Sequence, residues 1–91
     1  MRILWDEPKR RANLAKHGFD FADFEIGFSF ERFLAFPTRP SRTGRTRYRL
    51  VGTLFGDPVV VAIVSPLGSE AVAIVSLRLA NVKERTAYDR A

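Results

Sequence analysis

One histidine and several arginines are the side chains of this 91-residue chain best suited to chemistry. The imidazole of His17 belongs to the side-chain type that takes up and releases a proton near neutral pH. Lys9 is a second candidate for proton transfer, since crowding by arginines favours the neutral form of an amine. Arg47 and Arg78 carry the planar guanidinium that holds a phosphate through two parallel hydrogen bonds. Together these residues predict proton transfer beside a bound phosphate.

Helix signals surround the first two of these residues. Asp6 can accept hydrogen bonds from free amides of a first turn, and Pro8 fits that turn because no amide donor is needed there. Gly18 can adopt the left-handed conformation that ends a helix. The sequence therefore predicts a helix that ends near Lys16.

On this helix, Lys9, Asn13 and Lys16 follow one another at spacings of four and three and share one face. His17 lies beside them in the last turn. A basic face of this kind could contact an anion. The alternative interpretation is a solvated surface with a histidine that the helix dipole stabilises.

The net charge of +5 is concentrated in one part of the chain. No acidic residue lies between Glu31 and Asp57, whereas the rest of the chain holds nine basic and ten acidic residues. The basic residues in this segment are Arg32, Arg39, Arg42, Arg45, Arg47 and Arg49. Residues 37–46 are rich in Pro, Ser, Thr and Gly and read as a loop, which favours a polyanion partner. A loop that merely increases solubility is the alternative.

Composition excludes several classes of protein and site. The length fits one domain over residues 1–91. Without cysteine there is no disulfide or thiolate site, and a single histidine argues against a histidine-rich zinc site, so we expect catalysis without metal or cofactor. No apolar run approaches the roughly 20 residues that span a bilayer, and no secretory signal is visible at the start. We therefore expect a cytoplasmic protein without membrane contact.

The remaining patterns predict an α+β fold. A second helix is expected over residues 21–28, with Asp20 as its cap, and a C-terminal helix begins at Asn81 with a capping-box signature. Strands are expected over residues 2–5, 33–36, 47–54, 59–65 and 71–78, the last three forming an antiparallel meander. Strand alternation places Arg47 and Arg49 on one face, and Ser76 and Arg78 on the side of Val72 and Ile74.

Aromatic residues cluster in one part of the chain. Seven of the eight phenylalanines lie between Phe19 and Phe36. Phe21, Phe24 and Phe28 form one stripe of the second helix, and we interpret them as core rather than as partners for nucleic-acid bases. The run from Val59 to Val64 predicts a central strand covered on both faces or nearly so.

The order of these motifs is similar to that of a known family. The relevant residues are Trp5-Asp6, Lys9, Asn13, Lys16-His17-Gly18, the arginine before Gly52, the run Ile74 to Ala80, Glu84 and Tyr88. The chain resembles the BrnT toxins, small ribonucleases of bacterial type II toxin–antitoxin systems. This resemblance implies a RelE-like fold, with two N-terminal helices packed on an antiparallel sheet of about four to five strands.

The resemblance also implies an activity and partners. It points to a metal-independent endoribonuclease that cleaves mRNA and inhibits translation. A BrnA-like antitoxin neutralises this activity, and the toxin contacts operator DNA only through that antitoxin. Cleavage by the ribose 2′-hydroxyl needs a base, an acid and cations at phosphorus. The catalytic candidates are Lys9, His17, Arg47, Arg78, Glu84 and Tyr88. The candidates for RNA binding are Lys16, Arg39, Arg42, Arg45 and Arg49.

Three of these candidates have structural alternatives, and two positions depart from the family pattern. Arg78 could pair with Glu84, and Tyr88 could anchor the last helix to the sheet. The family usually has glutamate where Thr46 stands and often has arginine at Ala73. A catalytically weakened homologue that binds RNA or an antitoxin is therefore the alternative function, and a plain nucleic-acid-binding module is a third.

Overall fold

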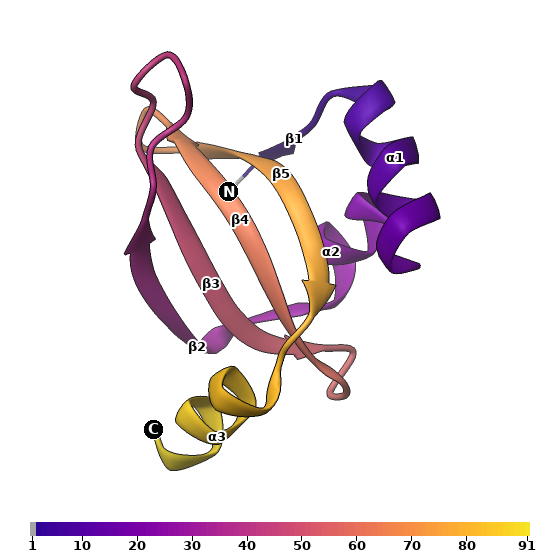
Figure 1. Cartoon of the computed structure of the whole chain (residues 1–91), viewed down its shortest axis with the longest axis vertical. Coiled ribbons are helices and arrows are strands. Elements are labelled where there is room, and N and C mark those ends of the chain that lie inside the picture. The colour runs from indigo at the N-terminus through magenta and orange to yellow at the C-terminus, as the bar shows by residue number, and fades with distance from the viewer. Residues whose placement is uncertain (1) are drawn as a thin grey trace.

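The structure, a computed structural model, describes residues 2–91 and folds them into three helices and five strands (Figure 1). In chain order the elements are β1 (Arg2–Leu4), α1 (Glu7–His17), α2 (Phe21–Gly27), β2 (Phe28–Thr38), β3 (Arg47–Leu54), β4 (Val59–Leu67), β5 (Ala71–Leu79) and α3 (Val82–Arg90). The predicted α+β class with a C-terminal helix is confirmed. Within residues 2–91, no helix is long and apolar enough to cross a membrane.

The five strands form one sheet in the order β1-β5-β4-β3-β2. The strands β3 to β5 form the predicted antiparallel meander and β2 extends it, but β1 pairs parallel to β5. The sheet is therefore mixed rather than antiparallel throughout. Parallel partners need a long connection, and here α1, α2 and three strands separate β1 from β5 along the chain.

Strand β2 is longer than predicted. The expected strand over residues 33–36 begins directly after α2 and extends to Thr38. Its pairing with β3 shifts in register between Phe28, which lies opposite Leu54, and Phe33, which lies opposite Gly52. Such a shift hides the start of a strand from a simple alternation pattern.

The signals at the helix ends are confirmed. The side chain of Asp6 accepts a hydrogen bond from the N–H of Lys9 at 3.3 Å, and Gly18 ends α1 with a φ of 77°. At the start of α3, Asn81 accepts from the N–H of Glu84, and the Glu84 side chain accepts from the N–H of Asn81. These local interactions fix where α1 begins and ends and where α3 begins.

One face of the sheet carries the larger core, which is covered by α2. Phe21 and Phe24 are fully buried, and the Phe24 ring lies 4.8 Å from that of Phe28. The sheet residues of this core, besides Phe28, are Ile3, Leu50, Leu54, Val60, Ala62, Val64, Ile74 and Leu77. The core prediction for these three phenylalanines is confirmed. Phe36 differs, because it packs against the opposite face of the sheet.

The opposite face is covered only in part. Tyr88 of α3 packs with Val51, Val61 and Ala80 in a second, smaller core. Farther along β4, Ile63 is only half-buried. The predicted coverage of β4 on both faces is therefore complete at Val61 but partial beyond it. Much of this second face, which we call the open face, remains accessible beside α1 (Figure 1).

Helix α1 is attached to the edge of β5 by the side chain of Asn13. Strand β1 pairs only with residues 71–73 of β5, which leaves Leu77 farther along the same edge. The Nδ2 of Asn13 donates to the Leu77 carbonyl at 2.9 Å, and the Leu77 N–H donates to Oδ1 of Asn13 at 3.1 Å. The buried amide thus takes the place of a strand, and it also donates to the carbonyl of Phe19.

A bulge in β5 decides which residues reach the open face. Ile63 lies opposite Ser76 and Val64 lies opposite Ile74, so Val75 is an extra residue. As a result, Ile74 belongs to the large core whereas Ser76 and Arg78 face the open side. The prediction that Ser76 and Arg78 share a side with Val72 and Ile74 is wrong, since a bulge breaks the period of two.

Candidate active site on the open face

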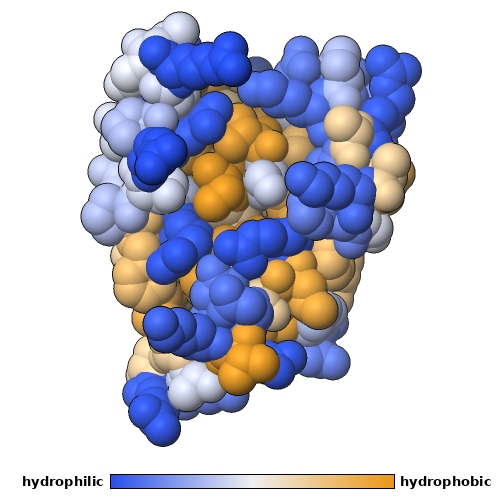
Figure 2. Space-filling model, viewed as in Figure 1, coloured by the Kyte–Doolittle hydropathy of each residue, from blue (hydrophilic) through white to orange (hydrophobic). Residues whose placement is uncertain are grey.

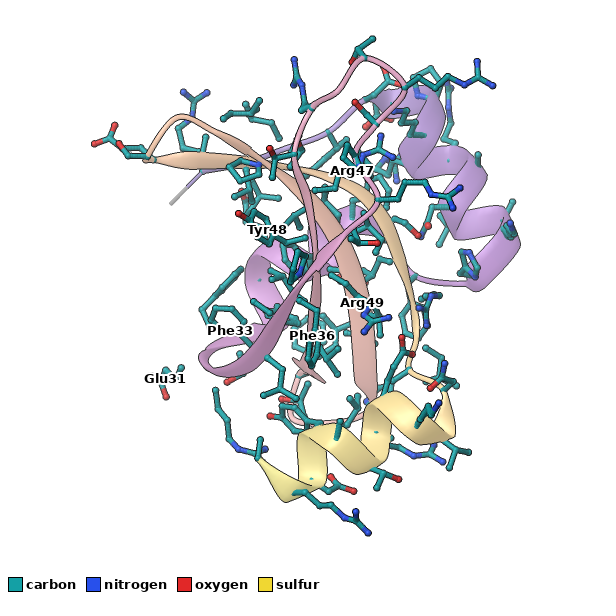
Figure 3. All side chains as sticks on the ribbon, turned by 60° about the vertical axis from the view of Figure 1, so that its left-hand side comes forward. Glu31, Phe33, Phe36, Arg47, Tyr48 and Arg49 are labelled. Carbon is teal, nitrogen blue, oxygen red and sulfur yellow. The ribbon has the colours of Figure 1, made fainter. Side chains whose placement is uncertain are left out.

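Cross-strand pairing builds the central row of the open face. Arg49 of β3 lies opposite Ile63 of β4, which lies opposite Ser76 of β5. Residues paired in this way point to the same face. Arg47 and Arg49 share one side of β3, whereas Tyr48 between them points to the α2 side (Figure 3). The predicted alternation of Arg47 and Arg49 is therefore confirmed.

The two N-terminal candidates for proton transfer meet an arginine in one hollow. Lys9, Lys16 and His17 from α1 and Arg47 from β3 line a hollow of about 410 Å³, which we call the His17 hollow. Its other lining residues are Ala12, Asn13, Ile63, Val75 and Ser76. On this side of the molecule, hydrophilic side chains flank and cross an apolar floor (Figure 2). Four basic groups around one concave site attract an anion.

The exposure of these groups suits contact with a ligand. Lys9 and Lys16 are exposed, and His17 and Arg47 are half-buried. The Nε of Arg47 is buried and has no hydrogen-bond partner among residues 2–91. Buried guanidinium nitrogens are usually hydrogen-bonded, so this donor is one that a bound anion could satisfy.

A second hollow of about 390 Å³ continues from the first toward the arginine-rich loop. Lys9 and Arg47 line both hollows, and Arg45 joins them in the second. Its other lining residues include Trp5, Asp6, Ser41, Thr43, Ser65 and Ala73. The two hollows together form a groove with cations along its length.

Arg78 and Glu84 share the open face but form a closed pair. The two terminal nitrogens of Arg78 donate to the two carboxylate oxygens of Glu84 at 2.8 and 2.9 Å. Glu84 is only 7% exposed. These bonds, with the Asn81 N–H and the charge of Arg49, lower the pKa of Glu84 to about 2, and the same pairing raises the pKa of Arg78. Arg78 does not line the His17 hollow.

Tyr88 anchors α3 and does not reach the His17 hollow. Its ring is buried, and its hydroxyl donates to the carbonyl of Arg32 at 3.2 Å. In return, Arg32 donates to the Tyr88 carbonyl, and its guanidinium carbon lies 4.0 Å from the Tyr88 ring centre. This arrangement supports the structural alternative for Tyr88.

The candidates for RNA binding are distributed along the open face and its rim. Arg39 and Arg42 are exposed in the loop between β2 and β3, and Arg45 lines the second hollow. Lys16 lines the His17 hollow. Arg49 stands on the far side of the face, where its guanidinium lies 3.6 Å from Glu84.

Some lining residues were not among the predicted site residues. Ser76 faces the His17 hollow because of the bulge at Val75, and Ser65 lines the second hollow. No local sequence signal identifies them, since both positions follow from strand register. Among residues 2–91, no group of three or more His, Cys, Asp or Glu side chains is arranged to hold a metal ion.

Comparisons with known proteins identify the family and agree with the fold. The family model described as the ribonuclease toxin BrnT of type II toxin–antitoxin systems matches residues 5–84. A crystal structure of the Brucella abortus ribonuclease toxin BrnT is similar with a TM-score of 0.72 and 42% sequence identity, covering 89% of this chain and 97% of that one. A search of curated proteins gave no match. With a family model over most of its length and a close structural relative, the chain belongs to the BrnT family of type II ribonuclease toxins.

Proposed function

We propose that this chain is a metal-independent endoribonuclease that cleaves mRNA and so inhibits translation. The observation that carries the proposal is the His17 hollow, where an imidazole, two ammonium groups and a guanidinium surround one concave site. Cleavage needs a base for the ribose 2′-hydroxyl, an acid for the leaving 5′-oxygen and cations at phosphorus. His17 and Lys9 share the proton transfers, and Arg47 and Lys16 hold the phosphate.

The remaining candidates support this centre from a distance. Glu84 fixes Arg78 and contacts Arg49 only at 3.6 Å, so the two arginines and one carboxylate together leave net positive charge on the open face. Tyr88 holds α3 against β2 and thereby keeps Glu84 in place. The loop arginines draw RNA toward the groove through its phosphates. An antitoxin of the BrnA type covers this basic surface and links the toxin to operator DNA.

The decisive experiment is cleavage of end-labelled single-stranded RNA by the purified chain in excess EDTA. We expect products with 5′-hydroxyl ends, because the ribose 2′-hydroxyl is the nucleophile. Arg47→Gln and His17→Ala should each lower the cleavage rate by roughly 100-fold or more. Both variants should keep a cooperative unfolding transition, because neither side chain belongs to the two cores.

A function in binding alone is the second candidate, and one position favours it. Ala73 lines the second hollow beside Arg45 and Arg47, where the family pattern often has arginine. Loss of that cation weakens charge stabilisation at phosphorus. Intact RNA at every protein concentration, together with measurable RNA binding, would establish this second candidate and reject the nuclease.

A further inference from the structure

We propose that a third hollow on the open face receives a nucleobase of the bound RNA. This hollow of about 280 Å³ lies between β2, β3 and α3 and is lined by Phe36, Arg49, Asn81, Lys83, Glu84 and Ala87. We call it the Phe36 hollow. The inference rests on the proposed function, because it assigns a further binding site to the same RNA substrate.

Phe36 lies outside the main core, on the open face of the sheet. Phe36 and Arg49 are directly paired across β2 and β3, so both face the open side. The five ring contacts between other phenylalanines join Phe24, Phe28, Phe30 and Phe33, and none includes Phe36. Phe36 is half-buried, with its ring centre 5.0 Å from the guanidinium carbon of Arg49. A ring and a guanidinium plane are the two surfaces on which bases stack.

Arg49 is held loosely enough to take part in binding. Glu84 gives both carboxylate oxygens to Arg78 at 2.8 and 2.9 Å, whereas its contact with Arg49 is 3.6 Å. The Nε of Arg49 is buried and lacks a hydrogen-bond partner among residues 2–91. Arg78 therefore satisfies the carboxylate, and Arg49 remains available for a base or phosphate.

The rim of the Phe36 hollow offers hydrogen-bond donors to a base edge. Asn81 uses its side-chain oxygen to cap α3, and its NH₂ group donates to no other residue of the described chain. Lys83 is exposed and forms no ion pair within residues 2–91. An apolar ring with a few convergent donors is the usual composition of a small-ligand site.

The Phe36 hollow lies within reach of an RNA chain in the His17 hollow. Arg49 is directly paired with Ile63, which forms part of the floor of the His17 hollow. Phe36 and Ile63 are thus two strands apart, a distance of about 10 Å. A chain whose phosphate rests beside His17 can place a nearby base over Phe36. Positive charge on Arg49 and Lys83 would attract an acidic side chain as well as RNA, and the ring of Phe36 favours a base over a carboxylate.

The test compares the parent and three variants on two ligands. Binding is measured by fluorescence anisotropy with a single-stranded RNA that carries 2′-O-methyl groups throughout, and with an abasic chain of equal length and charge. Phe36→Leu keeps an apolar side chain but removes the stacking ring. We expect it to weaken binding of the base-bearing RNA roughly tenfold and to leave binding of the abasic chain within about twofold. Phe36→Trp should bind the base-bearing RNA at least as tightly as the parent.

Phe33→Leu is the matched control, because Phe33 lies on the same strand and its ring contacts Phe28 and Phe30 on the other face. It should bind both ligands as the parent does. The subsite proposal is overturned if Phe36→Leu weakens binding of both ligands equally or of neither. It is also overturned if Phe33→Leu weakens binding of the base-bearing RNA as much as Phe36→Leu does. The 2′-O-methyl probe cannot be cleaved, so this experiment measures binding alone. The nuclease proposal fails in a separate experiment, if the parent protein leaves unmodified RNA intact.

Discussion

Among single residues, Glu84 governs which cations of the open face are free. Its carboxylate is nearly buried and accepts from Arg78 and from the Asn81 N–H. With a pKa of about 2 it stays ionised near neutral pH and accepts a proton poorly. We therefore interpret Glu84 as a positioning residue that fixes Arg78 and the start of α3, leaving proton transfer to His17 and Lys9.

The carboxylate of Glu84 should make stability depend on pH in acid. Hydrogen bonds from Arg78 lower its folded pKa from 4.5 to about 2. The unfolded state then binds a proton first, so the stabilisation is complete above about pH 4.5 and is lost as the pH falls toward 2. The loss should amount to about 3 kcal/mol in the free energy of unfolding. Urea denaturation between pH 7 and pH 2 measures it.

Glu84→Gln should remove most of this dependence and lower stability at pH 7, because Arg78 loses its charged partner. The difference between parent and variant isolates Glu84 from Glu7, whose pKa is also lowered by Arg10. Glu25→Gln changes an exposed carboxyl of α2 and serves as the control. If the free energy of unfolding of Glu84→Gln falls with decreasing pH as steeply as that of the parent, other carboxylates cause the pH dependence.

At the level of elements, the position of α1 depends on one buried amide. Asn13→Ala removes three hydrogen bonds and leaves both backbone groups of Leu77 without their side-chain partner. We expect a loss of about 2 to 3 kcal/mol in the free energy of unfolding. Since α1 carries Lys9, Lys16 and His17, the rate of RNA cleavage should also fall.

Hydrogen exchange gives this prediction a local readout. The Leu77 amide should exchange much faster in Asn13→Ala than in the parent, whereas amides in the centre of β4 should keep their relative protection. Ala15→Gln, at an exposed position of the same helix, should change neither measurement appreciably. An unchanged Leu77 amide in Asn13→Ala would mean that packing alone holds α1.

The elements also show what the sequence can reveal. The ends of α1 and α3 are predictable because Asp6, Gly18 and Asn81 act on amides within a few residues. The side of β3 that bears Arg47 and Arg49 is also predictable, because side chains alternate between the two faces of a strand. The parallel pairing of β1 and the bulge at Val75 depend on partners far away in the chain.

The candidate site, too, is predictable from the sequence only where local signals determine it. The sequence groups Lys9 and Lys16, which share one helix face, with His17 beside them in the last turn, and the structure adds Arg47 to their hollow. Composition alone assigns Phe36 to the phenylalanine cluster. Only the register of β2 shows that its ring lies on the open face beside Arg49.

Across the whole molecule, charge is distributed so that one groove faces a polyanion. The arginines between Glu31 and Asp57 lie on the open face, on its rim and in the loop above it, whereas the rest of the chain is nearly neutral. Local charge of this kind raises the rate and strength of RNA binding without choosing a sequence. Affinity and turnover should therefore respond to different residues.

Replacing Arg39 and Arg42 together by serine tests this separation. Each lost phosphate contact lowers the slope of log affinity against log salt by about 0.7, so the double variant should lose about 1.4. Cleavage at saturating RNA should change much less, because neither residue lines the His17 hollow. Arg2→Ser with Arg85→Ser removes the same net charge from exposed positions that line none of the three hollows. An equal fall in slope for this control would mean that RNA responds to the net charge of the protein rather than to the groove.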